Sequence, residues 1–142
     1  MKRLSWVPTA LLAAPLAAIV YLWFTFASPY GYQRPADLEP IAPGEHAVFV
    51  YGTLRYGVVR WLVYGRWGDP EPGVLDDHQR DGLDVEPRPG ARVPGLVLTV
   101  DAEELAQLDR YEHLGVRYRR IQTTLADGRR VWLYDRLTPP ES

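Results

Sequence analysis

The sequence predicts an α+β domain with a small mixed, largely antiparallel barrel-like sheet and few helices, preceded by one N-terminal transmembrane helix. Three observations lead to this prediction: short apolar segments separated by turn residues, one segment with a helical start signal, and an uncharged N-terminus. The chain has 142 residues, so we expect a single folded domain after the N-terminal segment.

The N-terminal segment contains no charged residue between positions 4 and 33. Residues 4–26 are almost wholly apolar and match the ~20 residues that span a bilayer as a helix, so we predict a transmembrane signal anchor there. Lys2 and Arg3 precede it, which by the positive-inside rule places the domain on the outer, extracytoplasmic face. Two alternatives stay open: a signal peptide cleaved near 25–27, and a buried helix of a soluble protein.

Residues 27–45 are predicted to form a linker, because they contain four prolines and no apolar periodicity. The domain is expected over 46–137, with a short tail at 138–142. From position 34 onward the chain carries 14 arginines and 18 acidic residues, so its net charge of −4 gives no basis for binding nucleic acid. The chain has no cysteine, which excludes a thiolate metal site and a cysteine nucleophile.

The first expected strand, 48–51, is a short apolar run that ends at Gly52. A loop that begins at a glycine can expose its backbone N–H groups to an anionic or carbonyl group. The segment 58–64 fits a helix or a strand, and its place after this loop favours a helix. The rest of the first half is expected to be poorly patterned at 73–84, where Val74 and Leu75 could start a strand, a loop at 86–91, and a strand at 93–100.

One clear helix is expected from Asp101, which can cap it, with Glu104 reaching back to the first turn. We expect this helix to continue to about Leu114 and to stop at Gly115. Two β-rich runs follow, 118–125 and 130–134, joined by an Asp-Gly pair that is typical of a hairpin turn.

Glu112 occupies an unusual position on this helix. At 100° per residue it falls within about 60° of Leu105 and Leu108, the apolar stripe that should face the core. A carboxylate there must be paired, hydrogen-bonded, or held in a cleft with a raised pKa. The structural alternatives are an ion pair with an arginine at 117, 119 or 120, or a helix that ends before Glu112; the functional one is a general acid/base.

Four ordered motifs resemble those of the γ-glutamylcyclotransferase-like family. They are Val-Phe-Val-Tyr-Gly-Thr-Leu-Arg at 48–55, Val-Pro-Gly at 93–95, Leu-Asp-Arg-Tyr-Glu at 108–112 followed by Tyr-Arg at 118–119, and Tyr134. The resemblance covers the whole predicted domain. It implies a small mixed barrel, and release of the γ-glutamyl group of a peptide or amine as 5-oxoproline without a metal or cofactor.

Carried over by position, the resemblance makes Glu112 the catalytic acid/base. It also assigns substrate binding to the loop after the first strand and to two later tyrosines, that is, to Tyr51, Gly52, Thr53, Leu54, Arg55, Tyr118 and Tyr134. The family's glutamate is commonly followed by glycine, whereas His113 stands here, so the rim of the pocket and the choice of substrate are expected to differ. The second hypothesis is a catalytically silent, membrane-tethered binding module of the same fold.

Overall fold

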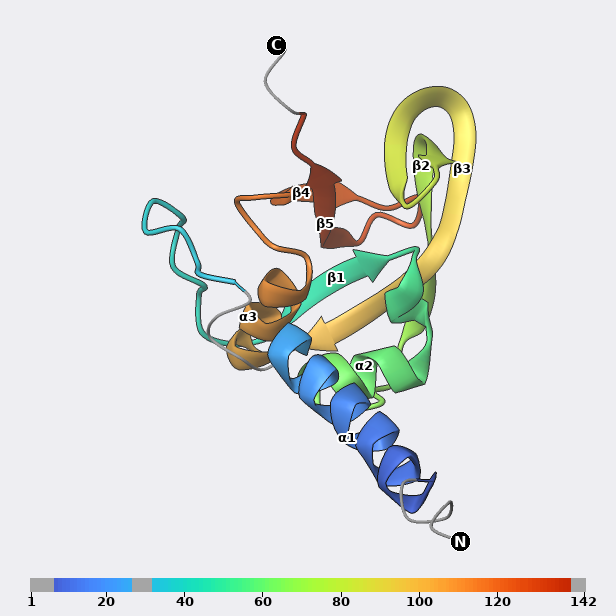
Figure 1. Ribbon diagram of the computed structural model, residues 1–142. Helices are drawn as coiled ribbons and strands as arrows, with labels where there is room; N and C mark the ends of the chain where they lie inside the picture. The colour runs from blue at the N-terminus through green and yellow to red at the C-terminus, as the bar shows by residue number, and fades with distance from the viewer. Residues whose placement is uncertain (1–6, 27–31, 139–142) are drawn as a thin grey trace, which may run out of the picture. The chain divides into compact units, whose positions relative to one another are not determined.

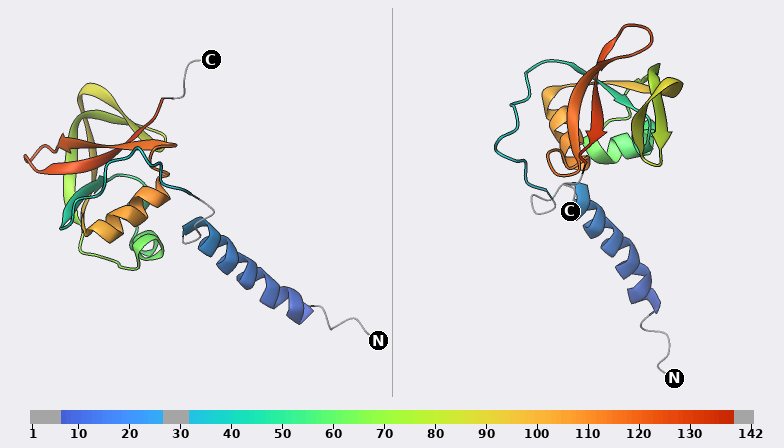
Figure 2. Two further views of the ribbon diagram at one scale, coloured as in Figure 1. Left: turned by 90° about the vertical axis from the view of Figure 1, so that its left-hand side faces the viewer. Right: turned by 90° about the horizontal axis from the view of Figure 1, so that it is seen from above.

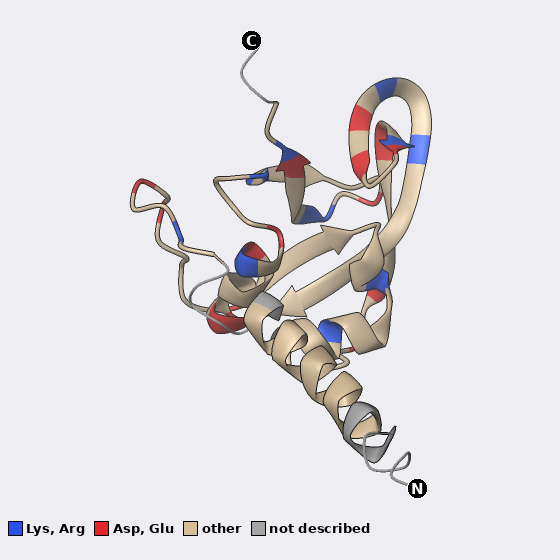
Figure 3. Ribbon diagram, viewed as in Figure 1, with Lys and Arg blue, Asp and Glu red and all other residues tan. Residues whose placement is uncertain are grey.

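The computed structural model describes residues 7–26 and 32–138, and the chain divides into two compact units, Met1–Gln33 and Arg34–Ser142. The first unit contains helix α1 (Val7–Phe26), which includes Pro15 and shows no charged position along its described length (Figure 3). Among the residues described, no helix is long and apolar enough to cross a membrane. The predicted transmembrane anchor over 4–26 is therefore not supported; residues 4–6 of it lie outside the described residues.

The second unit is built on a five-stranded sheet with the strand order β2-β3-β1-β5-β4 (Figure 1). The central strand β1 (His46–Val50) pairs antiparallel with β3 (Asp84–Val100) and parallel with β5 (Arg130–Arg136). The outer strands β2 (Glu71–Asp81) and β4 (Tyr118–Thr124) form antiparallel hairpins with β3 and β5. The predicted α+β class with a mixed, largely antiparallel sheet is confirmed.

The sheet is curled so that its two edges approach each other (Figure 2). The turn after β4 meets β2 directly, because the Ala126 N–H donates to the Val74 carbonyl over 2.9 Å. Inside the curl lies an apolar core of eight buried residues: Phe49, Tyr51, Leu75, Val93, Val97, Leu125, Val131 and Leu133. Since alternate residues of a strand face opposite sides, Tyr51 continues the inward-facing row of β1 that Phe49 begins.

Three short helical elements accompany the sheet: the 3-10 turn η1 (Thr53–Arg55), α2 (Gly57–Tyr64) and α3 (Ala102–Tyr111). The helix favoured over 58–64 is confirmed as α2. Helix α3 begins as predicted, with Asp101 and Glu104 forming a capping box. Its Leu105 and Leu108 are fully buried, so the apolar stripe holds α3 against the rest of the domain.

The prediction for 73–84 and 86–91 was wrong, because these residues form the long β2–β3 hairpin. Few of the outer residues of this hairpin are buried, so the alternation that identifies a half-buried strand is missing from the sequence. Backbone pairing holds the hairpin together instead, with a register shift between Asp76 and His78. Figure 3 shows acidic and basic positions interspersed along it.

The predicted linker is divided between the two units. Residues 27–31 lie outside the described residues, whereas Arg34 and the chain after it belong to the compact second unit. Side chains of this segment contact the folded domain, as described below.

Candidate active site

Glu112 lies directly after α3, where it is the C-terminal capping residue and its N–H donates to the Leu108 carbonyl over 2.9 Å. The helix thus ends at Tyr111 and not near Leu114 as predicted, because the chain turns sharply at His113, whose φ is +52°. The alternative of a helix that ends before Glu112 is therefore the one observed. The Glu112 side chain is only partly exposed. Its carboxylate has no hydrogen bond or ion pair within the described part of the chain.

Two of the three arginines proposed as structural partners of Glu112, Arg119 and Arg120, bind other carboxylates. Arg119 pairs with Asp135 at 2.7 Å, and Arg120 pairs with Asp109 at 2.8 Å. Burial, and next the negative charge of Asp84, raise the pKa of the Glu112 carboxyl to about 7. A carboxyl with this pKa exchanges protons near neutral pH, as a general acid/base requires.

The loop after β1 lies against the same end of α3. Tyr51 is buried at the end of the strand, and residues Thr53–Arg55 form the 3-10 turn. The Thr53 Oγ1 and the Tyr111 hydroxyl are hydrogen-bonded at 2.8 Å, which joins this loop to the residue next to Glu112. The first N–H groups of a helical turn have no partner within the turn, so this loop can offer backbone donors beside the carboxylate.

Among the other predicted loop residues, Leu54 is buried and has a packing role. Arg55 is exposed and its Nε donates to the Gly52 carbonyl over 3.1 Å. Arg55 therefore stabilises the loop through a hydrogen bond on its solvent-exposed side.

Tyr118 belongs to a cluster that the sequence did not reveal. Its hydroxyl donates to Asp84 over 2.6 Å, and Arg136 donates to the other oxygen of Asp84 over 2.8 Å. Burial would raise the pKa of Asp84, but these two hydrogen bonds hold it below its ordinary value. Asp84 thus stays ionised near Glu112. Its position could not be foreseen, because it depends on the unpredicted β2–β3 hairpin reaching the β4–β5 hairpin.

Tyr134 is buried and donates its hydroxyl to Asp109 over 2.6 Å. Burial, followed by the charge and hydrogen bond of Asp109, raises the pKa of Tyr134 well above its ordinary value. The negative charge of Glu112 contributes to the raised pKa of each of three tyrosines, Tyr51, Tyr118 and Tyr134. The structure therefore brings these three predicted tyrosines into the neighbourhood of the predicted acid/base.

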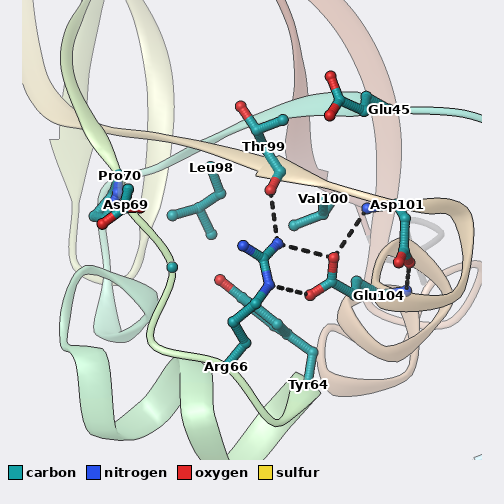
Figure 4. A pocket seen from close by; sticks show the side chains of 11 residues that line it. Glu45, Tyr64, Arg66, Asp69, Pro70, Leu98, Thr99, Val100, Asp101 and Glu104 are labelled. Carbon is teal, nitrogen blue, oxygen red and sulfur yellow. Dashed lines mark hydrogen bonds and ion pairs between the residues drawn. The ribbon is translucent and has the colours of Figure 1, made fainter.

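A cavity of about 570 Å³ lies elsewhere, between the end of β3 and the segment after α2 (Figure 4). Arg66 crosses it and donates twice to Glu104, each time over 2.8 Å, and once to the Thr99 carbonyl over 3.0 Å. None of the predicted site residues lines this cavity. It lies at the beginning of α3, whereas Glu112 lies at its end.

Comparisons with known proteins identify the family of this chain. The sequence model of the family described as "Gamma-glutamyl cyclotransferase, AIG2-like" matches residues 48–140, nearly two thirds of the chain. The chain belongs to this family. The resemblance drawn from the motifs is thereby confirmed.

Among members of known sequence, the "Putative gamma-glutamylcyclotransferase" of Vibrio cholerae serotype O1 is 33% identical over 108 residues, covering 63% of this chain and 81% of the relative. A solution structure from Arabidopsis thaliana is 26% identical, with a TM-score of 0.56, covering 70% of this chain and 66% of that one. A structure named "Gamma-glutamyl cyclotransferase" has a TM-score of 0.54 at 14% identity, covering 66% of this chain and 68% of that one. This last similarity concerns the fold alone.

The structure also accounts for one departure from the family pattern. His113 stands where glycine commonly follows the glutamate, and its φ of +52° lies in the region that favours glycine. The chain after Glu112 thus makes a sharp turn at a residue other than glycine.

Proposed function

We propose that this γ-glutamyl cyclotransferase family member is an enzyme that releases 5-oxoproline from a γ-glutamyl peptide or amine, with Glu112 as the general acid/base. The observation that carries the proposal is the Glu112 carboxyl, partly buried, without a hydrogen-bonding partner in the described residues, and with a pKa raised to about 7. Such a group lowers the stability of the fold, and carboxyls with strongly raised pKa values are concentrated at functional sites.

In the proposed reaction, the Glu112 carboxylate first removes a proton from the α-ammonium of the substrate. The freed amine attacks the γ-carbonyl carbon, and a five-membered ring closes with a tetrahedral centre. Glu112 then gives its proton to the leaving nitrogen, the bond between this nitrogen and the γ-carbon breaks, and the proton released by the ring nitrogen is taken up by the departing amine. Because the nucleophile is part of the substrate, positioning and one base suffice.

The loop over 51–55 is proposed to hold the glutamyl group. Backbone N–H groups at the start of η1 can bind its carboxylate or the oxygen that becomes negative during ring closure. Tyr51, Tyr118 and Tyr134 are proposed to line the pocket. The Tyr118 and Tyr134 hydroxyls donate their protons to Asp84 and Asp109, so toward a substrate these two oxygens can act as hydrogen-bond acceptors.

The test is a screen of γ-glutamyl peptides and γ-glutamyl amines for 5-oxoproline release, with Glu112→Gln as the inactive control. General acid/base catalysis is worth about 10²- to 10⁴-fold, so we expect a loss of that size in kcat. Activity should also rise with pH through about 7, as Glu112 ionises. Equal turnover by Glu112→Gln would remove Glu112 from the mechanism.

A catalytically silent binding module is the alternative. It predicts that γ-glutamyl compounds bind, as seen by calorimetry, but that none of them releases 5-oxoproline. The absence of a partner for the Glu112 carboxylate among the described residues favours the enzyme.

The site of action is a separate proposal that rests on the charges of the N-terminal sequence alone. We propose the extracytoplasmic face, attached through residues 4–26, although no described helix is long and apolar enough to cross a membrane. Degradation of the domain by protease added to intact cells would support this location, and protection until the cells are lysed would contradict it.

A further inference from the structure

We propose that residues 34–39 form a strap that holds the loop carrying Glu112 in its working position, with Arg34 and Asp109 as positioning residues. The strap lies outside the part of the chain that the family model matches, 48–140. Its role in catalysis rests on the proposed function, whereas its role in ordering the loop does not.

The first attachment of the strap is an ion pair. The Arg34 Nη1 donates to the Asp109 Oδ2 over 2.8 Å, while the Arg34 Nη2 donates to the Glu39 carbonyl over 2.9 Å. One guanidinium therefore makes a hydrogen bond within the strap and an ion pair to α3. A planar guanidinium makes both contacts at once, which a lysine cannot.

Asp109 is suited to be a rigid anchor. Its side chain is 1% exposed, and it accepts further hydrogen bonds from Arg120 over 2.8 and 3.2 Å and from Tyr134 over 2.6 Å. These donors come from β4 and β5, so Asp109 joins the strap, the end of α3 and the sheet. Asp109 also precedes Glu112 by a single helical turn.

The second attachment lies on the other side of Glu112. Gly115 has a φ of +84°, and a Cβ built on it would stand 2.8 Å from the Pro35 Cγ and 3.4 Å from the Leu38 Cδ1. The strap therefore touches the backbone of the loop where only glycine fits. The Leu114 N–H donates to the Asp109 carbonyl over 2.9 Å, which ties the two attachment points together.

The strap thus contacts the chain on both sides of Glu112, at Asp109 and at Gly115, each of which is three residues from Glu112. Its own carboxylate has no hydrogen bond in the described residues that could fix it, so its position depends on the backbone on either side. Misplacing a catalytic group by about 1 Å can cost about 10²-fold in rate. Loosening the strap should therefore affect kcat more than KM.

The experiment compares the full-length protein with Arg34→Ala, Arg34→Lys and Gly115→Ala. We expect kcat to fall about 10- to 100-fold in Arg34→Ala with KM changed less than about twofold, a partial recovery in Arg34→Lys, and a similar loss in Gly115→Ala. Hydrogen exchange followed by mass spectrometry should show faster exchange of the amides of 112–117 in Arg34→Ala and Gly115→Ala. This second measurement needs no substrate.

The matched control is Arg66→Ala, which breaks an arginine–carboxylate pair at the opposite end of the same helix. It should leave kcat and the exchange of 112–117 unchanged. Unchanged exchange and kcat in folded Arg34→Ala, or an equal loss of kcat in Arg66→Ala, would overturn the proposal. If Arg34→Ala does not fold, Leu38→Ala, which keeps the ion pair, decides by the same two measurements. If exchange of 112–117 is faster in Arg34→Ala but the unmodified protein releases 5-oxoproline from no substrate, the strap is supported and the proposed reaction is contradicted.

Discussion

Two carboxylates at the end of α3 lie one helical turn apart and have opposite surroundings. Asp109 is fully buried and accepts hydrogen bonds from two arginines and a tyrosine. Glu112 is partly exposed, has no donor in the described residues, and lies near the ionised Asp84. The Asp109 carboxylate is surrounded by hydrogen-bond donors, whereas burial and a neighbouring negative charge disfavour the ionised form of Glu112.

The difference shows that donors, and not burial alone, decide what a carboxylate does in this domain. Burial makes any anion costly, but two guanidinium groups and a hydroxyl compensate that cost at Asp109. At Glu112 no donor among the described residues compensates it, and burial together with the charge of Asp84 raises the pKa of this carboxyl. Asp109 therefore stabilises the fold, and Glu112 lowers its stability at the pH where it would act as a base.

The largest effect on stability is expected from Asp109→Asn. Removing one member of a buried ion pair leaves its partners without a counter-charge, and the free energy of unfolding should fall by about 3 kcal/mol or more. Urea denaturation followed by circular dichroism measures this. A change in the free energy of unfolding below about 1 kcal/mol would mean that Asp109 does not stabilise the fold through its ion pairs.

Glu112→Gln should act in the opposite direction. Because the pKa of Glu112 is raised in the folded protein from 4.5 to about 7, the folded state binds more protons and stability falls as the pH rises between these values. Removing the charge should therefore stabilise the protein by up to about 3 kcal/mol above pH 7 and by little below pH 4.5. Denaturation of both proteins at pH 4 and pH 8 tests this, and equal stability at pH 8 would contradict it.

Asp84→Asn should have a smaller effect, which is a change in the pKa of Glu112. The negative charge of Asp84 is the second cause, after burial, of the raised pKa of Glu112. Its removal should shift the acidic limb of the pH profile of kcat/KM to lower pH. Asp76→Asn is the control, since it removes an exposed carboxylate paired with Arg92 from the same hairpin; an equal shift there would show that Asp84 has no special role.

The smallest effect is expected at the beginning of α3. Arg66 and Glu104 form a pair in which the arginine side chain is 48% exposed, and exposed pairs contribute about 0.2–1 kcal/mol. Arg66→Ala should lower the free energy of unfolding by no more than that. A loss as large as that of Asp109→Asn would show that both ends of the helix carry structural ion pairs of equal weight.

Several features could be predicted because their signals are local. The capping box at Asp101, the hairpin turn at Gly128 and the apolar strand before Gly52 each depend on a few neighbouring residues. The spacing of Leu105 and Leu108 correctly placed both on the buried face of α3, but Glu112 does not continue that face, because the helix ends at Tyr111. These signals sufficed for the fold class and for the family.

Other features depend on residues far apart in the sequence, and only the tertiary structure decided them. The β2–β3 hairpin brings Asp84 to Tyr118, 34 positions away, and the strap brings Arg34 to Asp109, 75 positions away. No local pattern records such pairings, because nothing in the sequence around each of these residues identifies its distant partner. The sequence alone thus drew attention to Glu112, and the fold decided that within the described residues its carboxylate has no donor, while Asp109 has three.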